Sequence, residues 1–495
     1  MLDDLKRVGL GVLLALLAGC GGVDGAGGNP AGPAPQPEAP SGDSLSLAGV
    51  AAIGAALDGA TVTVRGPDGQ LIDLGDIVTG ANGSYQVDLP ADTPLPLLVI
   101  VQPPDGDPVR TVIPAAEDGA TSIVANVNPM TELVTNEVIG AANDDPASVA
   151  TSLGPVADDP AVIDATGDDV VQALFGNDVT YGSFADDPAF TAAGGDDLPT
   201  VADTLLDTLA DTAADDGKTL GTFLAEQRAL PTAPKLLEKP AFQVKLVGQL
   251  LAKGNAAEDI ESTLQASGAL APLPDGETTD VFRAAIQAVP EVIAQANAAT
   301  TSLDGSPDLK AAAAKAAVDT LANLVTERSE RFGDSPASVA TALASNGLRS
   351  AVASVVTNVV TPVLEQVAAR DDGGSGVVNA VDSVLRTTAK AAGKTLSAFS
   401  TSQIEATNVS ALATAHLQRN VVDANLADQL DAIQSGDATT TDLVVADDDV
   451  SKTTDALRDL VTGDPGLIDG GDADAVLDDP PGAWNVNDWN EFDWS

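Results

Sequence analysis

The sequence has little of the side-chain chemistry on which most enzymes depend. Its 495 residues include one histidine, His416, and one cysteine, Cys20. Zinc peptidases of the usual kind need more than one histidine ligand, so that class is excluded. A serine–histidine–aspartate triad would have to use His416, and no G-x-S-x-G nucleophile motif accompanies it. We therefore predict that the protein is not an enzyme, that it needs no cofactor and has no defined metal site, and that His416 belongs to a helix.

Basic and aromatic residues are also scarce. Lysine and arginine total 23 against 73 aspartate and glutamate residues, which gives a formal net charge of −50. Such a field repels nucleic acid and anionic lipid head groups, so we expect neither as a partner. We interpret the acidic surface mainly as a solvated, highly soluble one, on which divalent cations would bind only weakly. Aromatic residues make up 3% of the chain, too few for a sugar-binding platform outside its C-terminus.

Long hydrophobic runs are missing too. Residues 8–18 are apolar but too short for a permanent membrane helix, and no later run approaches the ~18 residues that a span needs. Lys6 and Arg7 precede this segment, and the residues Leu-Ala-Gly-Cys at 17–20 close it. A short basic region, a short apolar core and small residues before a cysteine together predict an export signal rather than a membrane helix.

This ending resembles the lipobox of bacterial lipoproteins. The resemblance implies that signal peptidase removes residues 1–19 and that the thiol of Cys20 carries a diacylglycerol. The lipid bilayer is then a partner through the acyl chains, which are numerous enough for stable attachment. Gly21 rather than aspartate follows the cysteine. By the same resemblance, this favours the outer membrane of the cell envelope, with the protein facing the periplasm or the cell surface.

Residues 20–44 are rich in glycine, proline, alanine and serine and show no apolar periodicity. Such a composition cannot bury a core, so we predict a disordered tether. Its root-mean-square reach of roughly 5–6 Å × √n, for n residues, would hold the first folded domain a few nanometres from the lipid.

Residues 45–125 carry the pattern of short β-strands. Residues 60–64 and 85–89 alternate in polarity, and 97–101 is a continuous apolar run; 110–113 and 71–74 are further strand candidates. The turn Pro67-Asp68-Gly69 separates two of them. Short strands with frequent turn signals predict a β-sandwich.

The segments 57–64 and 79–87 resemble the two characteristic strands of the carboxypeptidase regulatory-like domain. The resemblance implies a transthyretin-like (Ig-like) β-sandwich over 45–125. It also implies a non-catalytic spacer or docking module, in spite of the name of the family.

The motif Asn126-Val127-Asn128-Pro129 resembles the junction at which such lipoproteins pass from sandwich to helices. We predict that Thr131 caps a helix beginning at Glu132, and that a large α-helical domain extends over 130–465. Valines at 352, 355, 356, 359, 363 and 367 form an apolar helical stripe, and Pro362 predicts a kink or a break near its own position.

Asp-Asp-Pro-Ala recurs at 144–147, 158–161 and 186–189. Calcium sites are one interpretation. Helix capping is the stronger one, because aspartate accepts backbone N–H bonds at the N-cap and proline suits the first helical position.

The C-terminal residues 466–495 are predicted to form an acidic tail. All three tryptophans of the chain lie there five residues apart, and Phe492 lies between the last two. This spacing matches neither a helix nor a strand. Aromatic side chains are common anchors of protein interfaces. We predict either a docking motif for a protein partner or a tail that folds back onto its own helical domain; the candidate residues are Trp484, Trp489, Phe492 and Trp494.

These observations predict a multidomain α+β protein with a small N-terminal β-sandwich and a large, mainly α-helical domain. The function that they favour is a non-enzymatic envelope or cell-surface lipoprotein that binds or scaffolds another protein. The alternatives are a hydrolase that uses carboxylates to act on a polysaccharide, and a calcium-dependent adhesin.

Overall fold

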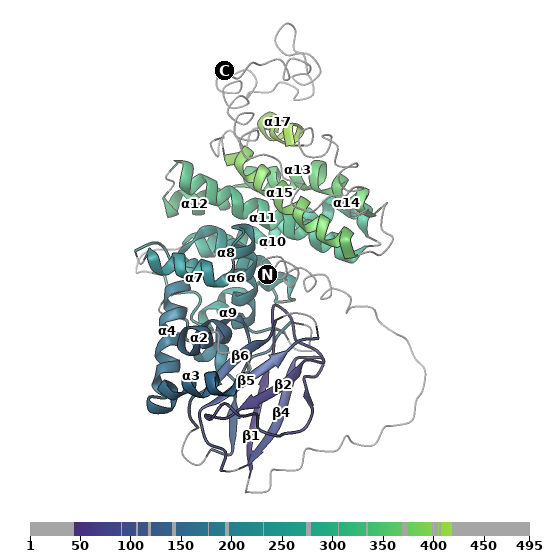
Figure 1. The fold of residues 1–495 in the computed structure, drawn as a ribbon. Helices are drawn as coiled ribbons and strands as arrows, with labels where there is room; N and C mark the ends of the chain where they lie inside the picture. Colours follow the sequence, from purple (N-terminus) through teal and green to yellow (C-terminus); the bar gives the residue numbers. More distant parts are fainter. Residues whose placement is uncertain are drawn as a thin grey trace, which may run out of the picture. The chain divides into compact units, whose positions relative to one another are not determined.

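The fold is known from a computed structural model, in which strands β1–β7 precede the helices and the chain is therefore α+β (Figure 1). It describes residues 44–417 except 91, 105–106, 117–119, 141–144, 177, 194–197, 231, 274–278, 305, 333–334, 369–374, 398, 400–403 and 405–406. The described chain divides into two compact units. The first unit extends to Glu238 and includes Ala252–Ala271, whereas the second comprises Lys239–Leu251 and the chain from Pro272 onward.

Two sheets form the N-terminal part of the first unit. The three-stranded sheet has the order β4-β1-β7, in which β1 is antiparallel to β4 and parallel to β7. The four-stranded sheet has the order β3-β2-β5-β6 and is antiparallel throughout. The strands are β1 (Ser44–Val50), β2 (Thr61–Arg65), β3 (Ile77–Val78), β4 (Ser84–Pro90), β5 (Leu97–Gln102), β6 (Val109–Ile113) and β7 (Ser122–Val124).

One hydrophobic core joins the two sheets. In β4, exposed and buried side chains alternate, so that Tyr85, Val87 and Leu89 point inward. Val62 and Val64 of β2 belong to the same buried cluster. The strands expected at 60–64, 85–89, 97–101 and 110–113 are thus confirmed to within a residue or two. The strand expected at 71–74 is wrong, because Leu71 makes only an isolated bridge to Arg65.

The turn predicted at Pro67-Asp68-Gly69 is confirmed. The Gly69 amide donates to the Gly66 carbonyl at 2.9 Å, and the Gln70 amide donates to Asp68 Oδ1 at 3.0 Å. Gly69 has φ +75°, a conformation that glycine adopts without strain. A side chain at this position would also overlap the backbone of Pro146. The turn therefore lies directly against the start of the helix α3 (Pro146–Asp158).

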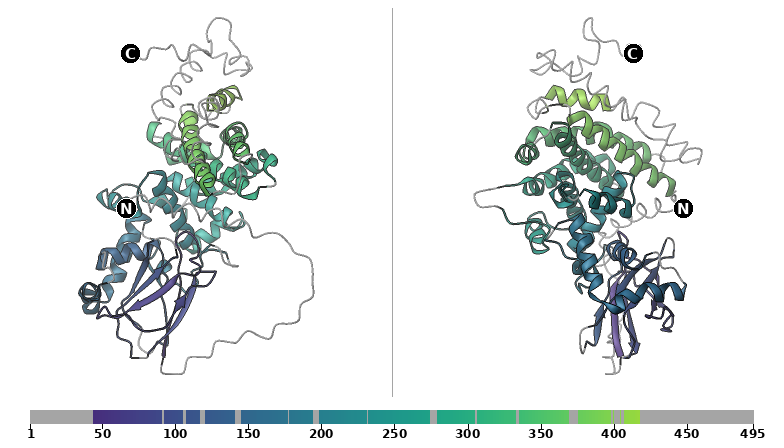
Figure 2. Two further views of the ribbon diagram at one scale, coloured as in Figure 1. Left: turned by 45° about the vertical axis from the view of Figure 1, so that its right-hand side comes forward. Right: turned by 60° about the vertical axis from the view of Figure 1, so that its left-hand side comes forward.

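Helices complete the first unit (Figure 2), and α2 packs on β6 at one edge of the four-stranded sheet (Figure 1). They are α2 (Pro129–Ile139), α3 (Pro146–Asp158), α4 (Ala161–Leu174), α5 (Gly182–Ala185), α6 (Val201–Asp215), α7 (Leu220–Ala229), the 3-10 turn η2 (Leu236–Glu238) and α9 (Ile260–Ala266).

The predicted start of α2 is wrong by three residues. Asn128, rather than Thr131, is the N-cap, and its Oδ1 accepts from the Met130 and Thr131 amides. Pro129 occupies the first helical turn, where its missing N–H costs nothing. Thr131 instead completes a capping box, because its Oγ1 accepts from the Asn128 amide at 2.9 Å.

Capping at the Asp-Pro motifs is confirmed at one of them. Asp145 Oδ2 accepts from the Ser148 amide at 2.9 Å at the start of α3, with Pro146 at the first helical position. Asp159 and Asp187 each accept from the amide two residues ahead. Neither of these is an N-cap: Pro160 is the N-cap of α4, and no helix begins after Asp187.

The described part of the second unit is helical. Its longest helices, α11 and α15, pack along each other, because Gly393 lets α15 approach closely: a Cβ there would lie 2.6 Å from Asn323 Cβ. The elements are α8 (Pro240–Ala252), α10 (Val281–Ala299), η3 (Thr301–Leu303), α11 (Pro307–Phe332), α12 (Pro336–Leu343), α13 (Asn346–Val355), η4 (Val356–Val360), α14 (Thr361–Ala368), α15 (Ser375–Ser397) and α17 (Thr407–Leu417).

Pro362 widens its helix instead of breaking it. A π-helical turn, η4, connects α13 to α14 just before the proline, and the Thr361 amide donates to the Val356 carbonyl. The valine stripe expected around it is confirmed, since all six side chains are buried. The continuous helix Asn346–Glu365 is long and apolar enough to cross a membrane, unlike any run expected from the sequence. More than half of it is buried, as in the core helix of a soluble protein.

Candidate functional site

The site residues predicted from the sequence lie outside the described part of the chain. This holds for the lipidation residue Cys20 and for the tail residues Trp484, Trp489, Phe492 and Trp494. His416 is described only as a position near the end of α17. The described residues of the first unit nevertheless hold two clusters of buried polar side chains, which the sequence analysis did not identify.

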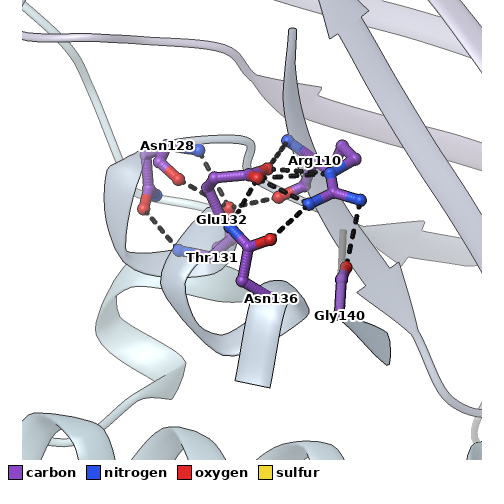
Figure 3. A network of polar contacts seen from close by, with 6 residues as sticks. All are labelled: Arg110, Asn128, Thr131, Glu132, Asn136 and Gly140. Atoms are coloured by element: carbon purple, nitrogen blue, oxygen red, sulfur yellow. Dashed lines mark hydrogen bonds and ion pairs between the residues drawn. The ribbon is translucent and has the colours of Figure 1, made fainter. Parts of the chain in front are cut away.

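The first cluster is centred on Arg110 of β6 (Figure 3). Its guanidinium and the Glu132 carboxylate of α2 form a bidentate ion pair. Arg110 Nη2 lies 2.7 Å from Glu132 Oε1, and Arg110 Nε lies 3.2 Å from both carboxylate oxygens. The Arg110 amide also donates to Glu132 Oε2 at 2.7 Å. The two side chains are 9% and 23% exposed, so solvent weakens the pair little.

Neighbouring groups complete this Arg110 network. Arg110 donates to Asn136 Oδ1 at 2.7 Å and to the Gly140 carbonyl at 3.4 Å, at the end of α2. Thr131 Oγ1 donates to the Arg110 carbonyl at 3.1 Å. These hydrogen bonds and the ion pair hold α2 against the sheet. The Arg110 network therefore connects strand β6 to helix α2.

Two asparagines extend this hydrogen-bond network to α5 and to the residues that follow it. Asn126 Nδ2 donates to the Asp187 carbonyl at 3.0 Å, and Asn128 Nδ2 donates to the Phe184 carbonyl at 2.7 Å. Asn126 Oδ1 in turn accepts from the Val50 amide of β1. The motif at 126–129 thus bridges the three-stranded sheet, α2 and the segment that follows α5.

The second cluster comprises Asp203 and Asp207 of α6 and Lys253, the residue after α8; we call it the Lys253 cluster. The two aspartates are four residues apart, so both carboxylates project from one face of the helix. Lys253 Nζ lies 2.8 Å from Asp203 Oδ2 and 2.5 Å from Asp207 Oδ2. The side chains of Lys253, Asp203 and Asp207 are only 5%, 1% and 6% exposed.

The hydrogen bonding of the Lys253 cluster is incomplete. Asp203 Oδ2 accepts a further bond from the Ala193 amide at 3.3 Å. Asp207 Oδ1, by contrast, is buried without a hydrogen-bond partner. A buried carboxylate oxygen with no donor is costly, because the charge loses its water and gains nothing in return.

Burial controls the protonation of this cluster. It raises the pKa of Asp207 to about 7, and the charges of Asp203 and Asp211 act in the same direction, against Lys253. Burial likewise raises the pKa of Asp203. Burial lowers the pKa of Lys253, but the two carboxylates outweigh it and leave that pKa above its usual value. Near neutral pH the cluster therefore contains a cation, a carboxylate and a second carboxyl group that readily holds a proton.

A sequence signal for this cluster exists only in part. Leu205, Leu206 and Leu209 form an apolar stripe on α6 and are buried. Asp203 and Asp207 interrupt that apolar helix, which could have marked them as buried acids in need of a partner. Lys253 is 46 residues beyond Asp207, and no periodicity connects the two positions. Within the described residues, no group of three or more histidine, cysteine, aspartate or glutamate side chains is arranged to hold a metal ion.

Comparison with protein-family models, with curated proteins and with solved structures found no match to this chain. The assignment of a function therefore depends on the residues themselves.

Proposed function

We propose that this chain is a non-enzymatic envelope lipoprotein that is anchored through Cys20 and binds or scaffolds another protein. The observation that carries the proposal is the sequence Leu17-Ala18-Gly19-Cys20 at the end of a short apolar segment that follows Lys6 and Arg7. By its resemblance to lipoproteins, the protein belongs to the outer membrane and faces the periplasm or the cell surface.

The place of β1 in the chain supports this arrangement. β1 begins at Ser44, directly after the glycine- and proline-rich residues 20–43 that join it to the anchor. We further propose that the two sheets are a transthyretin-like sandwich of the carboxypeptidase regulatory-like kind. In support, β2 and β4 coincide with the segments 57–64 and 79–87 that carry the resemblance. Such a module would act as a spacer or docking unit.

The protein partner is proposed to bind the C-terminal tail. The aromatic residues of this strongly acidic tail are Trp484, Trp489, Phe492 and Trp494. Aromatic anchors supply much of the binding energy of protein interfaces. Their acidic surroundings favour a partner with a basic, apolar groove.

The anchor is tested with Cys20→Ser. Wild-type protein should incorporate radioactive palmitate in cells and pellet with membranes, whereas the variant should incorporate none and remain uncleaved. Ser46→Ala, which keeps Cys20, is the matched control and should behave like the wild type. A wild-type protein that takes up no lipid would refute the anchor.

The tail is tested by site-directed photo-crosslinking from position 487, between Trp484 and Trp489, in intact cells. A crosslinked partner should appear with the wild-type tail and disappear when the three tryptophans become alanine. The matched control replaces Asn485 and Asn490 with alanine and should keep the crosslink. An unchanged crosslink without the tryptophans would remove them from the interface.

A further inference from the structure

We propose that Lys253 and Asp207 become joined by an intramolecular amide bond, with Asp203 as the group that moves the proton. The proposal concerns a covalent modification inside the first unit and does not depend on the function proposed above. It explains three features of the Lys253 cluster: the position of the amine, the orphaned carboxyl oxygen and the presence of a second acid.

The amine is already in contact with the carboxyl group that it would attack. Lys253 Nζ lies 2.5 Å from Asp207 Oδ2, an oxygen bonded to the electrophilic carbon Cγ. Both side chains are at least nine-tenths buried, so the contact is held away from competing water. Fixing two reacting groups next to each other replaces a bimolecular encounter by an intramolecular step. This removes the entropic cost of bringing the groups together, which is a large part of the barrier to condensation.

The unpartnered Asp207 Oδ1 shows which carboxyl group is the electrophile. Asp203 is stabilised as a carboxylate by both Lys253 and the Ala193 amide. Asp207 has the lysine alone, and its second oxygen has no donor. Burial accordingly raises the pKa of Asp207 to about 7, so that its carboxyl group holds a proton more readily than an exposed aspartate does. A protonated carboxyl group is the form that an amine can attack.

The step balances within the three side chains. The Lys253 ammonium gives a proton to the Asp203 carboxylate, and the neutral amine attacks Cγ of the protonated Asp207. Asp203, after receiving the proton, delivers one to the departing hydroxyl and takes the remaining proton from the nitrogen. An N–C bond forms, a C–O bond breaks, and one water molecule leaves. The net change converts the Lys253 ammonium, the Asp203 carboxylate and the Asp207 carboxylic acid into an amide, a protonated Asp203 and water, with no oxidant or activating cofactor required.

The buried setting favours the product. In water, an ammonium and a carboxylate are well solvated, and their condensation is opposed. In the cluster both charges have lost their solvation, and their mutual attraction recovers only part of that cost. Conversion to a neutral amide removes both charges from the low-dielectric interior. It also leaves Asp203 as the single remaining acid, still held by the Ala193 amide.

The second unit provides an internal control. There, Asp319 lies between Lys315, with Nζ 2.7 Å from Oδ2, and Lys245, with Nζ 3.8 Å from Oδ1. Both oxygens of Asp319 therefore lie next to an amine, unlike those of Asp207, whose Oδ1 has no partner. We expect no amide bond at Asp319.

The test is peptide mass mapping of the purified full-length protein after denaturation and protease digestion. The expected result is a pair of peptides containing Asp207 and Lys253, joined and lighter than their sum by one water molecule. Peptides containing Asp319 should have their full masses. Recovery of Asp207 and Lys253 only in separate peptides of full mass from natively folded wild-type protein would overturn the proposal.

Two variants separate the bond from the ion pairs. Lys253→Arg keeps the positive charge but should abolish the linked peptides. Asp203→Asn keeps both reacting groups and should reduce the linked fraction at least tenfold after equal incubation. A linked fraction in Asp203→Asn equal to that of the wild type would overturn the role of Asp203. The wild-type result decides the main question even where a variant folds poorly.

Discussion

The two compact units each bury a cluster of aspartate and lysine, and the two clusters have opposite composition. The Lys253 cluster of the first unit has two carboxylates and one amine. The cluster around Asp319 in the second unit has one carboxylate and two amines. The chain has a net charge of −50, and its negative potential opposes the ionisation of a second carboxyl group in the first cluster. The same potential stabilises the positive charge of a second amine in the other cluster. The Lys253 cluster is therefore the one in which a carboxyl group can hold a proton near neutral pH and react with the amine.

The sharpest way to break this comparison is to remove the amine from the first unit. Lys253→Met removes the amine, so that neither the ion pairs nor the amide bond can form and two buried carboxyl groups are left without a cation. We expect the free energy of unfolding of the first unit to fall by at least about 3–5 kcal/mol. Denaturant-dependent hydrogen–deuterium exchange, read on peptides of each unit, measures it. Lys315→Met is the matched control and should cost less, because Lys245 remains near Asp319. Equal losses in the two units would contradict the comparison.

The pH dependence of stability should appear when the amide bond is prevented. In Lys253→Arg protein, a raised folded-state pKa means that folded Asp207 holds its proton when the unfolded chain has lost it. Its contribution is then complete below pH about 4 and is lost as the pH rises to about 7, by about 1.4 kcal/mol per unit. Denaturant unfolding at several pH values measures this slope.

The control for the pH prediction is Asp207→Asn in the same Lys253→Arg background, which should flatten that part of the curve. The linked wild type should be flat as well, because an amide does not titrate. A slope that survives the loss of Asp207 would assign the titration to another group.

A smaller loss of stability is expected when the Arg110 network between β6 and α2 is disrupted. Glu132→Ala leaves the Arg110 guanidinium without its carboxylate, although Asn136 and Gly140 still accept from it. We expect a loss of about 1.5–3 kcal/mol confined to the first unit, measured by thermal and denaturant unfolding. The exposed ion pair of Arg228 with Glu137 is the control, and Glu137→Ala should change stability by less than about 1 kcal/mol.

The smallest effects concern two glycines, one in each unit. Gly393→Ala places a methyl group against Asn323 of α11, and we expect a loss of about 1–3 kcal/mol in the second unit. Gly221 of α7 has open space around it, so Gly221→Ala should stabilise the first unit by about 0.4–1 kcal/mol. Opposite signs in calorimetry would confirm the tight contact of α11 and α15.

Local pattern predicted the elements better than their ends or their partners. The alternation at 85–89 and the valine stripe from 352 to 367 follow from burial on one face, so the sequence carried them directly. The start of a helix depends on competing caps, and the side-chain oxygen of Asn128 caps α2 in place of the expected Thr131. The break considered at Pro362 does not occur, because a π-helical turn directly before the proline keeps α13 and α14 continuous.

The buried clusters could not be predicted, because each is assembled from distant parts of the chain. Arg110 meets Glu132 through the docking of a helix on a strand, and Lys253 reaches Asp203 and Asp207 although it follows Asp207 by 46 positions in the chain. A residue such as Asp207 looks, in the sequence, like many other aspartates of this acidic chain. Only its burial distinguishes it. The predicted anchor and tail residues stay predictions.

The bridge made by Asn126 and Asn128 has a consequence for how such a protein can diversify. Recombination that replaced everything after residue 125 would leave Arg110 without Glu132 and the Val50 amide without the Asn126 side chain that accepts from it. The strands and the helices that follow them should therefore be inherited together. Insertions and exchanges are better tolerated in loops that share no such bonds.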